Sequence, residues 1–536
     1  MKPRLQVEIS AGERTAPLRV PDSGRSVADL PGTEADESDG GQARRVAAGA
    51  LTQQAAQVSG LVVLLAVVTV LAHRLTLAEL GTYGLTATLA VYLLIVKNSI
   101  GGAAQRAMVA ARGDDDRAEA FTTAAGLYAI TGAVTGVLIA GVGSGIAAVV
   151  LDGDLRHQAQ LGVVGLGLVT AAGLATTVNL DALRAALLLT RSAANEIAGL
   201  LLFAAVMLML ALSDAPLWSL IAASGTIPLF SGTINMVSRR RSGVAFRLRR
   251  GGFTRSRAAL LAPTAGWLLL IELSTLVIYG LDRVVLGLFG SPSQIGLYEG
   301  PVRAHNVIYA LAQALGVTAL PVAASTLAAG DRDRMRRLFL QGSRFSSALL
   351  VPLVVTAMAM AAPALDVWLG PKFREAAPAL TILISYWLVY GSLALIPNFL
   401  VGAGRARQVG LTVAGIAALN LVLSLAFTPS LGVEGPALGT AVAYLLGLPL
   451  MLRIGLDASG VSLGELARGA WLPAYALGAV LGAVLVGLRL AIEPDSLLAV
   501  VPLLVGGPVL YWLAYAGLVL GDDERALVRS LFSRRR

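Results

Sequence analysis

Long stretches without charged residues, separated by short charged segments, make up most of the chain. A helix needs roughly 20 mostly apolar residues to cross about 30 Å of hydrocarbon, and these stretches do not alternate polar and apolar residues as a membrane barrel would. The pattern therefore predicts an all-α polytopic membrane protein with 14 transmembrane helices. Each predicted span is built on a run of at least 17 residues that carries no charge, except for Glu272 in the seventh run. The runs are 46–72, 80–96, 120–151, 158–180, 197–213, 215–238, 258–281, 304–330, 345–365, 376–404, 408–433, 435–452, 469–488 and 496–521.

The composition agrees with this fold class and excludes several kinds of chemistry. Of 536 residues, 56% are hydrophobic and 14% are charged, whereas soluble domains carry about 25% charged residues. The absence of cysteine excludes disulfides, thiolate nucleophiles and iron–sulfur clusters. The three histidines, His73, His157 and His305, are far apart, and no G-x-x-x-x-G-K-[ST] phosphate loop occurs. We therefore expect no metal, no other cofactor, no enzymatic reaction and no ATP hydrolysis by this chain.

Lysine and arginine are distributed unevenly between the two sides of the predicted spans. With the terminal tails left aside, 22 basic residues lie on the side of the termini and six on the other, namely Arg74, Arg156, Arg283, Lys372, Arg374 and Arg489. Because cytoplasmic loops are the more basic ones, we predict a protein of the plasma (inner) membrane with both termini cytoplasmic. The net charge of +9 indicates contact with anionic membrane lipids and no nucleic-acid partner, since no basic run is interleaved with aromatic residues.

A weak internal repeat divides the chain into two halves. The tripeptide Gly-Thr-Tyr at 81–83 returns as Gly-Leu-Tyr at 296–298, a shift of 215 residues, and Arg191 matches Arg405 at a shift of 214. Parallel repeats of this kind build the two halves of many transporters. The sequence therefore predicts two pseudo-symmetric six-helix lobes that face each other across a central cleft.

The domain organisation follows from the spans, the repeat and the charged segments. Gly478 and Gly482 in the thirteenth span supply a face of small residues through which the last two helices can pack. We predict a disordered cytoplasmic tail at 1–45, an N-lobe of helices 1–6 at 46–238, a basic cytoplasmic linker at 239–257, a C-lobe of helices 7–12 at 258–456, a C-terminal pair of helices 13–14 at 457–521, and a cytoplasmic tail at 522–536.

Four segments of characteristic spacing follow one another along the chain. Residues 74–84 read RLTLAELGTYG, Asp282 precedes the Gly-Leu-Tyr at 296–298, residues 370–380 read GPKFREAAPAL, and residues 402–437 contain Gly-Ala-Gly-Arg, an asparagine and Gly-Val-Glu-Gly. In this order they resemble the signatures of the polysaccharide and oligosaccharide flippases in the multidrug/oligosaccharidyl-lipid/polysaccharide (MOP) exporter superfamily. The resemblance covers roughly residues 46 to 456.

The resemblance implies a flippase for cell-surface polysaccharide biosynthesis. Its cargo would be a lipid-linked, polyprenyl-diphosphate oligosaccharide that passes from the inner to the outer leaflet while the two lobes alternate access to the cleft. Helices 13 and 14 would border a groove for the lipid tail. Expected partners are this lipid-linked glycan, membrane lipids, and polysaccharide polymerase or glycosyltransferase machinery. The alternatives are a lipid II flippase, a MATE-like cation or drug exporter, and a membrane glycosyltransferase or ligase, for which the predicted outside connections are short.

Two basic residues at bilayer depth are the candidate substrate-binding groups. Lys97 lies deep in the second span and Arg303 opens the eighth, and intramembrane charges usually face a cavity or a partner. We expect both to line the cleft and bind the cargo diphosphate. The alternatives are snorkelling of Lys97 to the lipid headgroups and an ion pair of Arg303 with Glu272 or Asp282.

The remaining candidates concern coupling and the edges of the cleft. Glu272 and Asp282 are candidate coupling groups or counter-ions, and Glu272 can carry a proton inside the membrane. Arg191 and Arg405 on inner loops are further candidates, which either face a phosphate or serve only as orientation signals. The polar residues Asn98 and Asn306 are predicted to line the cavity, and the alternative for Asn98 is to bridge helices.

Overall fold

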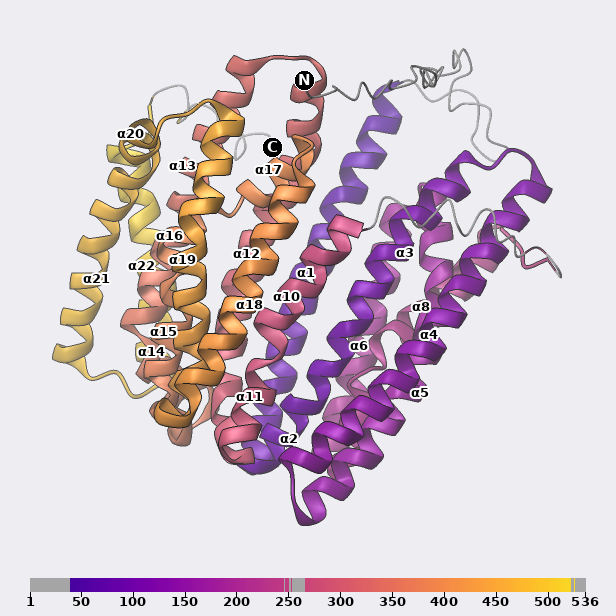
Figure 1. The fold of residues 1–536 in the computed structure, drawn as a ribbon, viewed down its shortest axis with the longest axis horizontal. Helices are drawn as coiled ribbons and strands as arrows, with labels where there is room; N and C mark the ends of the chain where they lie inside the picture. Colours follow the sequence, from indigo (N-terminus) through magenta and orange to yellow (C-terminus); the bar gives the residue numbers. More distant parts are fainter. Residues whose placement is uncertain (1–38, 245, 250–251, 253–265, 522–524, 526–536) are drawn as a thin grey trace, which may run out of the picture.

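All elements that the structure describes are helices. The structure is a computed structural model that describes residues 39–244, 246–249, 252, 266–521 and 525 (Figure 1). Ten of the described helical segments are long and apolar enough to cross a membrane, and a bent pair of helices makes an eleventh. The predicted all-α polytopic fold is confirmed, and the count of 14 spans stays a prediction.

The helices of the first half pack mainly on one another, and we call them the N-terminal bundle. Helix α4 packs along α5, α1 packs on α6, and α5 also contacts α7 and α8. The helices are α1 (Asp39–Arg74), α2 (Leu77–Ala87), α3 (Val91–Ala110), α4 (Asp114–Val150), α5 (Gly153–Ala185), α6 (Leu189–Leu212), α7 (Leu217–Ala223) and α8 (Ile227–Arg241), with a short 3-10 turn, η2 (Thr88–Ala90), joining α2 to α3.

The second half forms the C-terminal bundle. Its elements are α10 (Gly266–Gly280), α11 (Asp282–Phe289), α12 (Pro292–Ala328), α13 (Arg332–Ala359), α14 (Ala361–Leu369), η4 (Pro371–Ala376), α15 (Ala377–Ser385), α16 (Trp387–Tyr390), η5 (Gly391–Leu393), α17 (Ile396–Gly402), α18 (Ala406–Leu431), α19 (Glu434–Ser459), α20 (Leu463–Leu466), η6 (Ala467–Trp471), α21 (Leu472–Ile492) and α22 (Leu497–Leu518). A Cβ on Gly478 would lie 2.7 Å from Val351, and one on Gly482 would lie 3.2 Å from Val355. The predicted packing face of α21 is therefore confirmed, and it lies against α13.

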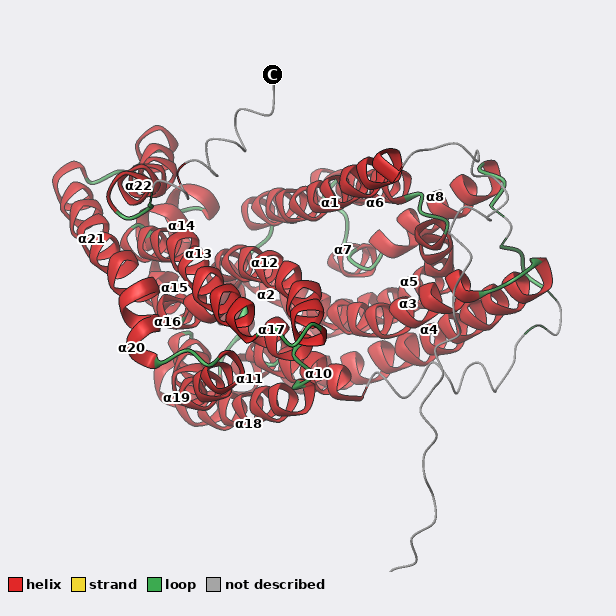
Figure 2. Cartoon of the chain, turned by 90° about the horizontal axis from the view of Figure 1, so that it is seen from above, coloured by secondary structure: helices red, strands yellow, loops and turns green. Residues whose placement is uncertain are grey.

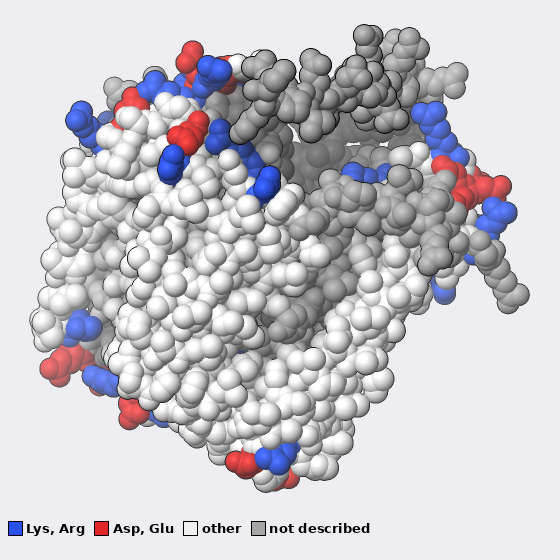
Figure 3. All heavy atoms as spheres, viewed as in Figure 1, with Lys and Arg blue, Asp and Glu red and all other residues white. Residues whose placement is uncertain are grey.

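The two ends of the molecule differ in charge. We call the end where α8 finishes and α13 begins the basic end, and the end that holds α2 and α11 the α2 end (Figure 1). The six basic residues predicted on the far side from the termini all lie at the α2 end, in or beside α1, α5, α11, η4 and α21. Between the charged ends, the face in Figure 3 is a broad uncharged belt, as expected for a surface in contact with lipid.

Several predicted boundaries differ from the helix ends. The segment 282–303, predicted as an outside connection, is helical as α11 and the start of α12. Helix α1 begins at Asp39, before the predicted start of the first span at residue 46. Residues 1–38 of the predicted tail, most of 522–536 and part of the predicted linker 239–257 lie outside the described residues. The domain boundaries remain predictions.

Helices α2 and α12 form the main contact between the bundles. Each begins with a capping box: Thr76 with Glu79 for α2, and Ser291 with Gln294 for α12. A Cβ on Gly81 would overlap the carbonyl oxygen of Pro292. The two helix backbones therefore touch through the repeated Gly-x-Tyr motif, and seen from above, α2 and α12 lie between the two bundles (Figure 2).

The described contacts between bundles gather at the α2 end. Trp368 of α14 donates from Nε1 to Thr69 Oγ1 of α1 at 2.7 Å, and Lys372 Nζ donates to the Leu75 carbonyl at 3.3 Å. The bundles are thus joined at the α2 end, where α2 meets α12 and α1 meets α14.

Candidate functional site

A buried ion-pair cluster lies where α12 meets α2. Glu299 is 1% exposed and binds two guanidinium groups: Arg283 of α11 donates from Nε to Oε1, and Arg303 donates from Nε to Oε2 at 3.1 Å. Arg283 is 5% exposed, whereas Arg303 is 20% exposed and is thus the member of the cluster that solvent reaches. Burying a charge is costly unless it is paired, so Glu299 allows both arginines to lie inside the protein.

Asp282 extends this cluster along α11. Its Oδ2 accepts a hydrogen bond from the Tyr298 hydroxyl at 2.8 Å, and the carboxylate lies next to Arg283. Asp282, Arg283, Glu299 and Arg303 therefore form a series of alternating charges with no net charge. Asp282 and Tyr298 belong to one of the four segments that carry the family resemblance, and their side chains are hydrogen-bonded in the fold.

Arg303 is paired, but with a residue that the sequence reasoning did not select. Its partner is Glu299, one helical turn earlier on α12, rather than Glu272 or Asp282. The pattern of apolar runs does not reveal Glu299, because it predicts 282–303 as a connection between two spans. The Ser-Pro-Ser-Gln sequence at 291–294, a capping box with proline at the first helical position, is the signal that places Glu299 and Arg303 on one helix.

Glu272 stays apart from this cluster. It is half-buried on α10, and no hydrogen bond or ion pair joins it to another residue in the described part of the chain. Its carboxylate is within electrostatic range of Tyr309 on α12. Among the described residues Arg303 pairs with Glu299, and the predicted pairing of Glu272 with Arg303 is not found.

The second predicted cation is located only by its backbone. Lys97 and Asn98 lie in α3, about 20 Å along the helix from its end at Ala110, and their side chains are outside the described residues. Asn306, predicted to line the cavity, is half-buried on α12, and its Oδ1 lies 3.4 Å from His305 Nδ1.

A cluster of aromatic rings around His305 joins four segments of the C-terminal bundle. His305 Nε2 is 2.8 Å from the Tyr386 hydroxyl, which is 2.9 Å from that of Tyr279, which is 2.6 Å from that of Tyr444. This series of hydrogen bonds satisfies the polar groups of four side chains at membrane depth, where an unpaired polar group would be costly. It also fixes α10, which carries Glu272, against α12, which carries Arg303. The rings are Tyr279, His305, Tyr309, Tyr386, Trp387, Tyr390 and Tyr444.

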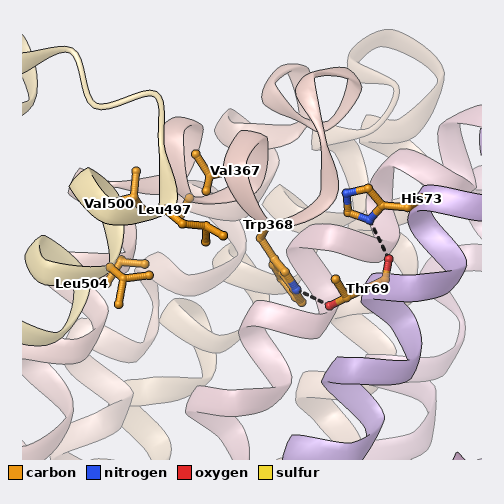
Figure 4. A pocket seen from close by; sticks show the side chains of 9 residues that line it. Thr69, His73, Val367, Trp368, Leu497, Val500 and Leu504 are labelled. Carbon is orange, nitrogen blue, oxygen red and sulfur yellow. Dashed lines mark hydrogen bonds between the residues drawn. The ribbon is translucent and has the colours of Figure 1, made fainter.

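An apolar groove of about 420 Å³ opens at the α2 end, between the bundles. Figure 4 shows Thr69 and His73 of α1 and Trp368 of α14 on one side, and Leu497, Val500 and Leu504 of α22 on the other. The expected groove beside the last two helices is thus lined by α22, while α21 contributes none of the residues that line it.

Arg191 and Arg405 occupy corresponding places in the two bundles. Arg191 is in the first turn of α6 and donates from Nη1 to Ser242 Oγ, and Arg405 immediately precedes α18. Both are at the basic end. Arg191 also lines a second pocket, of about 430 Å³, between α6 and α8.

These features define a multi-pass membrane protein of two helical bundles, closed at one end by glycine contacts beside a buried ion-pair cluster. The sequence pattern of the family described as "Polysaccharide biosynthesis protein" matches residues 70–378. The chain belongs to this family, and the predicted resemblance to polysaccharide flippases agrees with it.

One relative and two solved structures are informative. Over 206 residues the chain is 26% identical to the "Probable flippase AglR" of Haloferax volcanii, and the match covers 37% of this chain and 42% of AglR, less than half of its length. The lipid II flippase MurJ, in an inward closed conformation, superposes with a TM-score of 0.66 at 14% identity, over 90% of this chain and 99% of MurJ. An inward-facing MATE multidrug transporter of the MOP superfamily gives 0.62 at 13% identity, over 77% of this chain and 98% of its own. At these identities the two structures establish a shared fold.

Proposed function

We propose that this protein is a flippase that moves a polyprenyl-diphosphate-linked oligosaccharide from the inner to the outer leaflet. The observation that supports the proposal is the contact between the two bundles, which is concentrated at the α2 end, through α2 with α12 and α1 with α14. Two bundles joined in this way can rock on their contact, and in the proposal this rocking exposes the space between them to one side of the membrane and then to the other. A polar headgroup needs such a path because its hydroxyls and phosphates are costly to bring into hydrocarbon.

The proposed topology has 14 crossings and cytoplasmic termini. Ten or eleven described segments meet the length and hydropathy of a span, and α2–α3, α10–α11 and α12 would supply the other three. The excess of arginine at the basic end favours the cytoplasmic side of an inner membrane for that end. The joined α2 end then faces away from the cytoplasm, and lipid-linked precursors would enter between the bundles from the basic end.

We assign the cargo diphosphate to Arg303 and Lys97. Arg303 uses Nε and Nη2 for Glu299, so its Nη1 is the group left to donate to a phosphate oxygen. Asn98 and Asn306 would contact the glycan, and Arg191 and Arg405 would meet phosphate at the entrance. The lipid tail would leave at the outer leaflet along the apolar groove that α22 lines.

We further propose that Glu272 couples transport to protons. It is a half-buried carboxylate without an ion-pair partner among the described residues, which favours uptake of a proton inside the membrane. Asp282 would serve instead as a counter-ion, since Tyr298 and Arg283 already occupy it. In this proposal the protein makes and breaks no bond, and a polymerase or glycosyltransferase uses its product.

Reconstitution in vesicles tests the proposed function. Purified protein is incorporated with a fluorescent polyprenyl-diphosphate glycan, and the fraction that becomes accessible on the opposite leaflet is measured over time. We expect Arg303→Ala and Lys97→Ala each to slow translocation at least tenfold while the protein stays folded. Arg334→Ala, which removes an exposed charge from α13, is the matched control. Transport at the wild-type rate in both cavity variants would contradict the assignment.

The nearest alternatives are a lipid II flippase and a MATE-like exporter. The MurJ fold extends over 90% of this chain and the MATE fold over 77%, which favours a flippase architecture over an exporter architecture. The same vesicles, loaded with lipid II or with a cationic dye, separate the three functions. Movement of the dye alone would replace the flippase proposal with cation export.

A further inference from the structure

A pocket on the flank of the N-terminal bundle combines unmatched positive charge with an apolar floor. It lies between the first turns of α6 and the last turns of α8, has a volume of about 430 Å³, and is lined by Arg191, Asn195, Thr233, Ile234, Val237, Ser238 and Arg241. We call it the α6–α8 groove. The buried charge cluster, the aromatic rings around His305 and the groove beside α22 all lie elsewhere.

The two guanidinium groups of the groove lack carboxylate partners in the described part of the chain. Arg191 donates to a serine hydroxyl, and Arg241 forms no ion pair with a described residue. The nearest acid on α6, Glu196, is already bound by Arg184 at 2.9 Å and by Gln53 at 3.1 Å. Two arginines without counter-ions at one rim attract an anion, and the planar fork of each suits phosphate oxygens.

The amide side chains behind the rim are also arranged to donate. Asn195 Nδ2 donates to Asn235 Oδ1 at 2.9 Å, and Asn235 is fully buried while its own amide nitrogen has no partner. Ser238 adds a hydroxyl at the same level. Asn235 does not itself line the groove, so the donors available to a ligand are the second amide hydrogen of Asn195 and the Ser238 hydroxyl.

Polarity changes with depth along α8 in the order that a lipid requires. Arg241 is at the end of the helix, and Val237 and Ile234 lie one and two turns deeper, about 6 Å and 10 Å along the axis. A lipid has the same order, with an anionic phosphate at the membrane surface and an apolar chain below it. A small soluble anion has no apolar part that could pack on Val237 and Ile234.

We propose that the α6–α8 groove binds the phosphate of an anionic lipid from the inner leaflet, with the start of its apolar chain over Val237 and Ile234. The proposal rests on the proposed orientation of the basic end and extends the role proposed for Arg191 at the entrance, and binding in the groove does not require that the protein transports the cargo. Arg191 and Arg241 hold the phosphate, Asn195 and Ser238 donate to its oxygens, and the occupied groove joins α6 to α8.

Lipid binding to the purified full chain, measured by native mass spectrometry in detergent, tests the proposal. The probes are phosphatidylglycerol, a polyprenyl diphosphate without glycan, and inorganic diphosphate. We expect the double variant Arg191→Gln/Arg241→Gln to weaken binding of at least one of the two lipids at least tenfold. The matched control, Arg112→Gln/Arg240→Gln, removes the same charge from exposed positions at the same end of the same bundle and is expected to bind like the wild type.

The variant Val237→Trp, which fills the apolar floor, separates a lipid from a free anion. It is expected to reduce lipid binding and to leave the binding of inorganic diphosphate unchanged. A stronger effect on phosphatidylglycerol would identify a bulk phospholipid, and a stronger effect on polyprenyl diphosphate would identify the carrier lipid. Equal losses in the groove and control variants, or inorganic diphosphate binding as tightly as either lipid, would overturn the proposal. Because the readout is binding, this result is independent of whether the protein transports the proposed cargo.

Discussion

Glu299 lies between two guanidinium groups at a depth where a lone carboxylate would be very costly. The pairing is geometrically complete, since each carboxylate oxygen accepts from one arginine. Removing one partner from a buried ion pair leaves an uncompensated charge, and this is usually more damaging than removing both. The stability of the α11–α12 region therefore depends on this one side chain.

The substitution Glu299→Gln is expected to destabilise the folded protein by about 3–5 kcal/mol. It leaves Arg303 without an ion-pair partner and Arg283 with only Asp282 beside it. The loss is measured as a lower thermal midpoint in detergent. Glu465→Gln is the matched control, because Glu465 pairs with Arg336 at an exposed position of α20, where ion pairs contribute little. Equal midpoints for the two variants would contradict the importance of the buried cluster.

Glu272 has a different environment and a different expected phenotype. If it is the coupling group, transport by the wild type varies with pH as this carboxylate gains and loses its proton. The variant Glu272→Gln cannot titrate and is expected to give a flat profile in the vesicle assay, whereas Glu375→Gln, at an exposed position of η4, keeps the original one. A wild-type profile in Glu272→Gln would exclude this residue as the coupling group.

At the scale of helices, the contact between α2 and α12 depends on residues without side chains. A Cβ on Gly84 would overlap the Glu299 carboxylate, and one on Gly296 would overlap the Leu77 carbonyl oxygen. Backbone atoms cannot move aside as a side chain can, so a larger residue here pushes one helix from the other.

The variant Gly81→Ala is expected to open the α2 end. The chain has no native cysteine, so a single cysteine at Leu297, half-buried on α12, reports on access. Labelling by a membrane-impermeant maleimide from the α2 side is expected to rise severalfold in this background. Gly517→Ala on α22, where an added Cβ meets nothing within 4 Å, is the control. Unchanged labelling in Gly81→Ala would mean that the contact does not close this end.

The sequence predicted the helices better than their breaks. Charge-free runs correspond to most spans because hydropathy alone keeps these residues in the membrane. The break at Thr88–Ala90 and the irregular segment around Tyr390 and Gly391 carry no charge or proline signal. They arise where a span bends to pack on its neighbours, which a single sequence does not specify.

The candidate site was predictable only in part. Arg303 and Asp282 were identified because charges in or beside apolar spans are rare. The partner Glu299 could be found from the capping box of α12, but the hydrogen-bonded chain through Tyr279, His305 and Tyr444 could not. Its members are distant in the sequence and meet only after four segments have packed.

At the scale of the whole molecule, the proposed transport would require the two bundles to separate at the α2 end. The hydrogen bond from Trp368 to Thr69 joins them there. Any tether that prevents this separation keeps the protein open to one side, and alternating access then stops.

The double variant Thr69→Cys/Trp368→Cys, joined by a short reducible bis-thiol cross-linker, is expected to lose transport and to regain it on reduction. The control is Ala348→Cys/Trp512→Cys, because Trp512 donates to the Ala348 carbonyl at 2.9 Å within the C-terminal bundle. Each pair replaces one tryptophan, but only the first pair links the N-terminal bundle to the C-terminal bundle. Full transport in the cross-linked first pair would exclude a rocking mechanism at this contact.

The capped, glycine-bearing helix start occurs twice, 215 residues apart, and the two copies touch each other. A surface that recognises its own duplicate is what a symmetric homodimer requires. An ancestor of half this length could therefore have assembled from two identical subunits before gene fusion joined them. By the same reasoning, the two halves of this protein are expected to associate in the membrane when they are co-expressed as separate polypeptides.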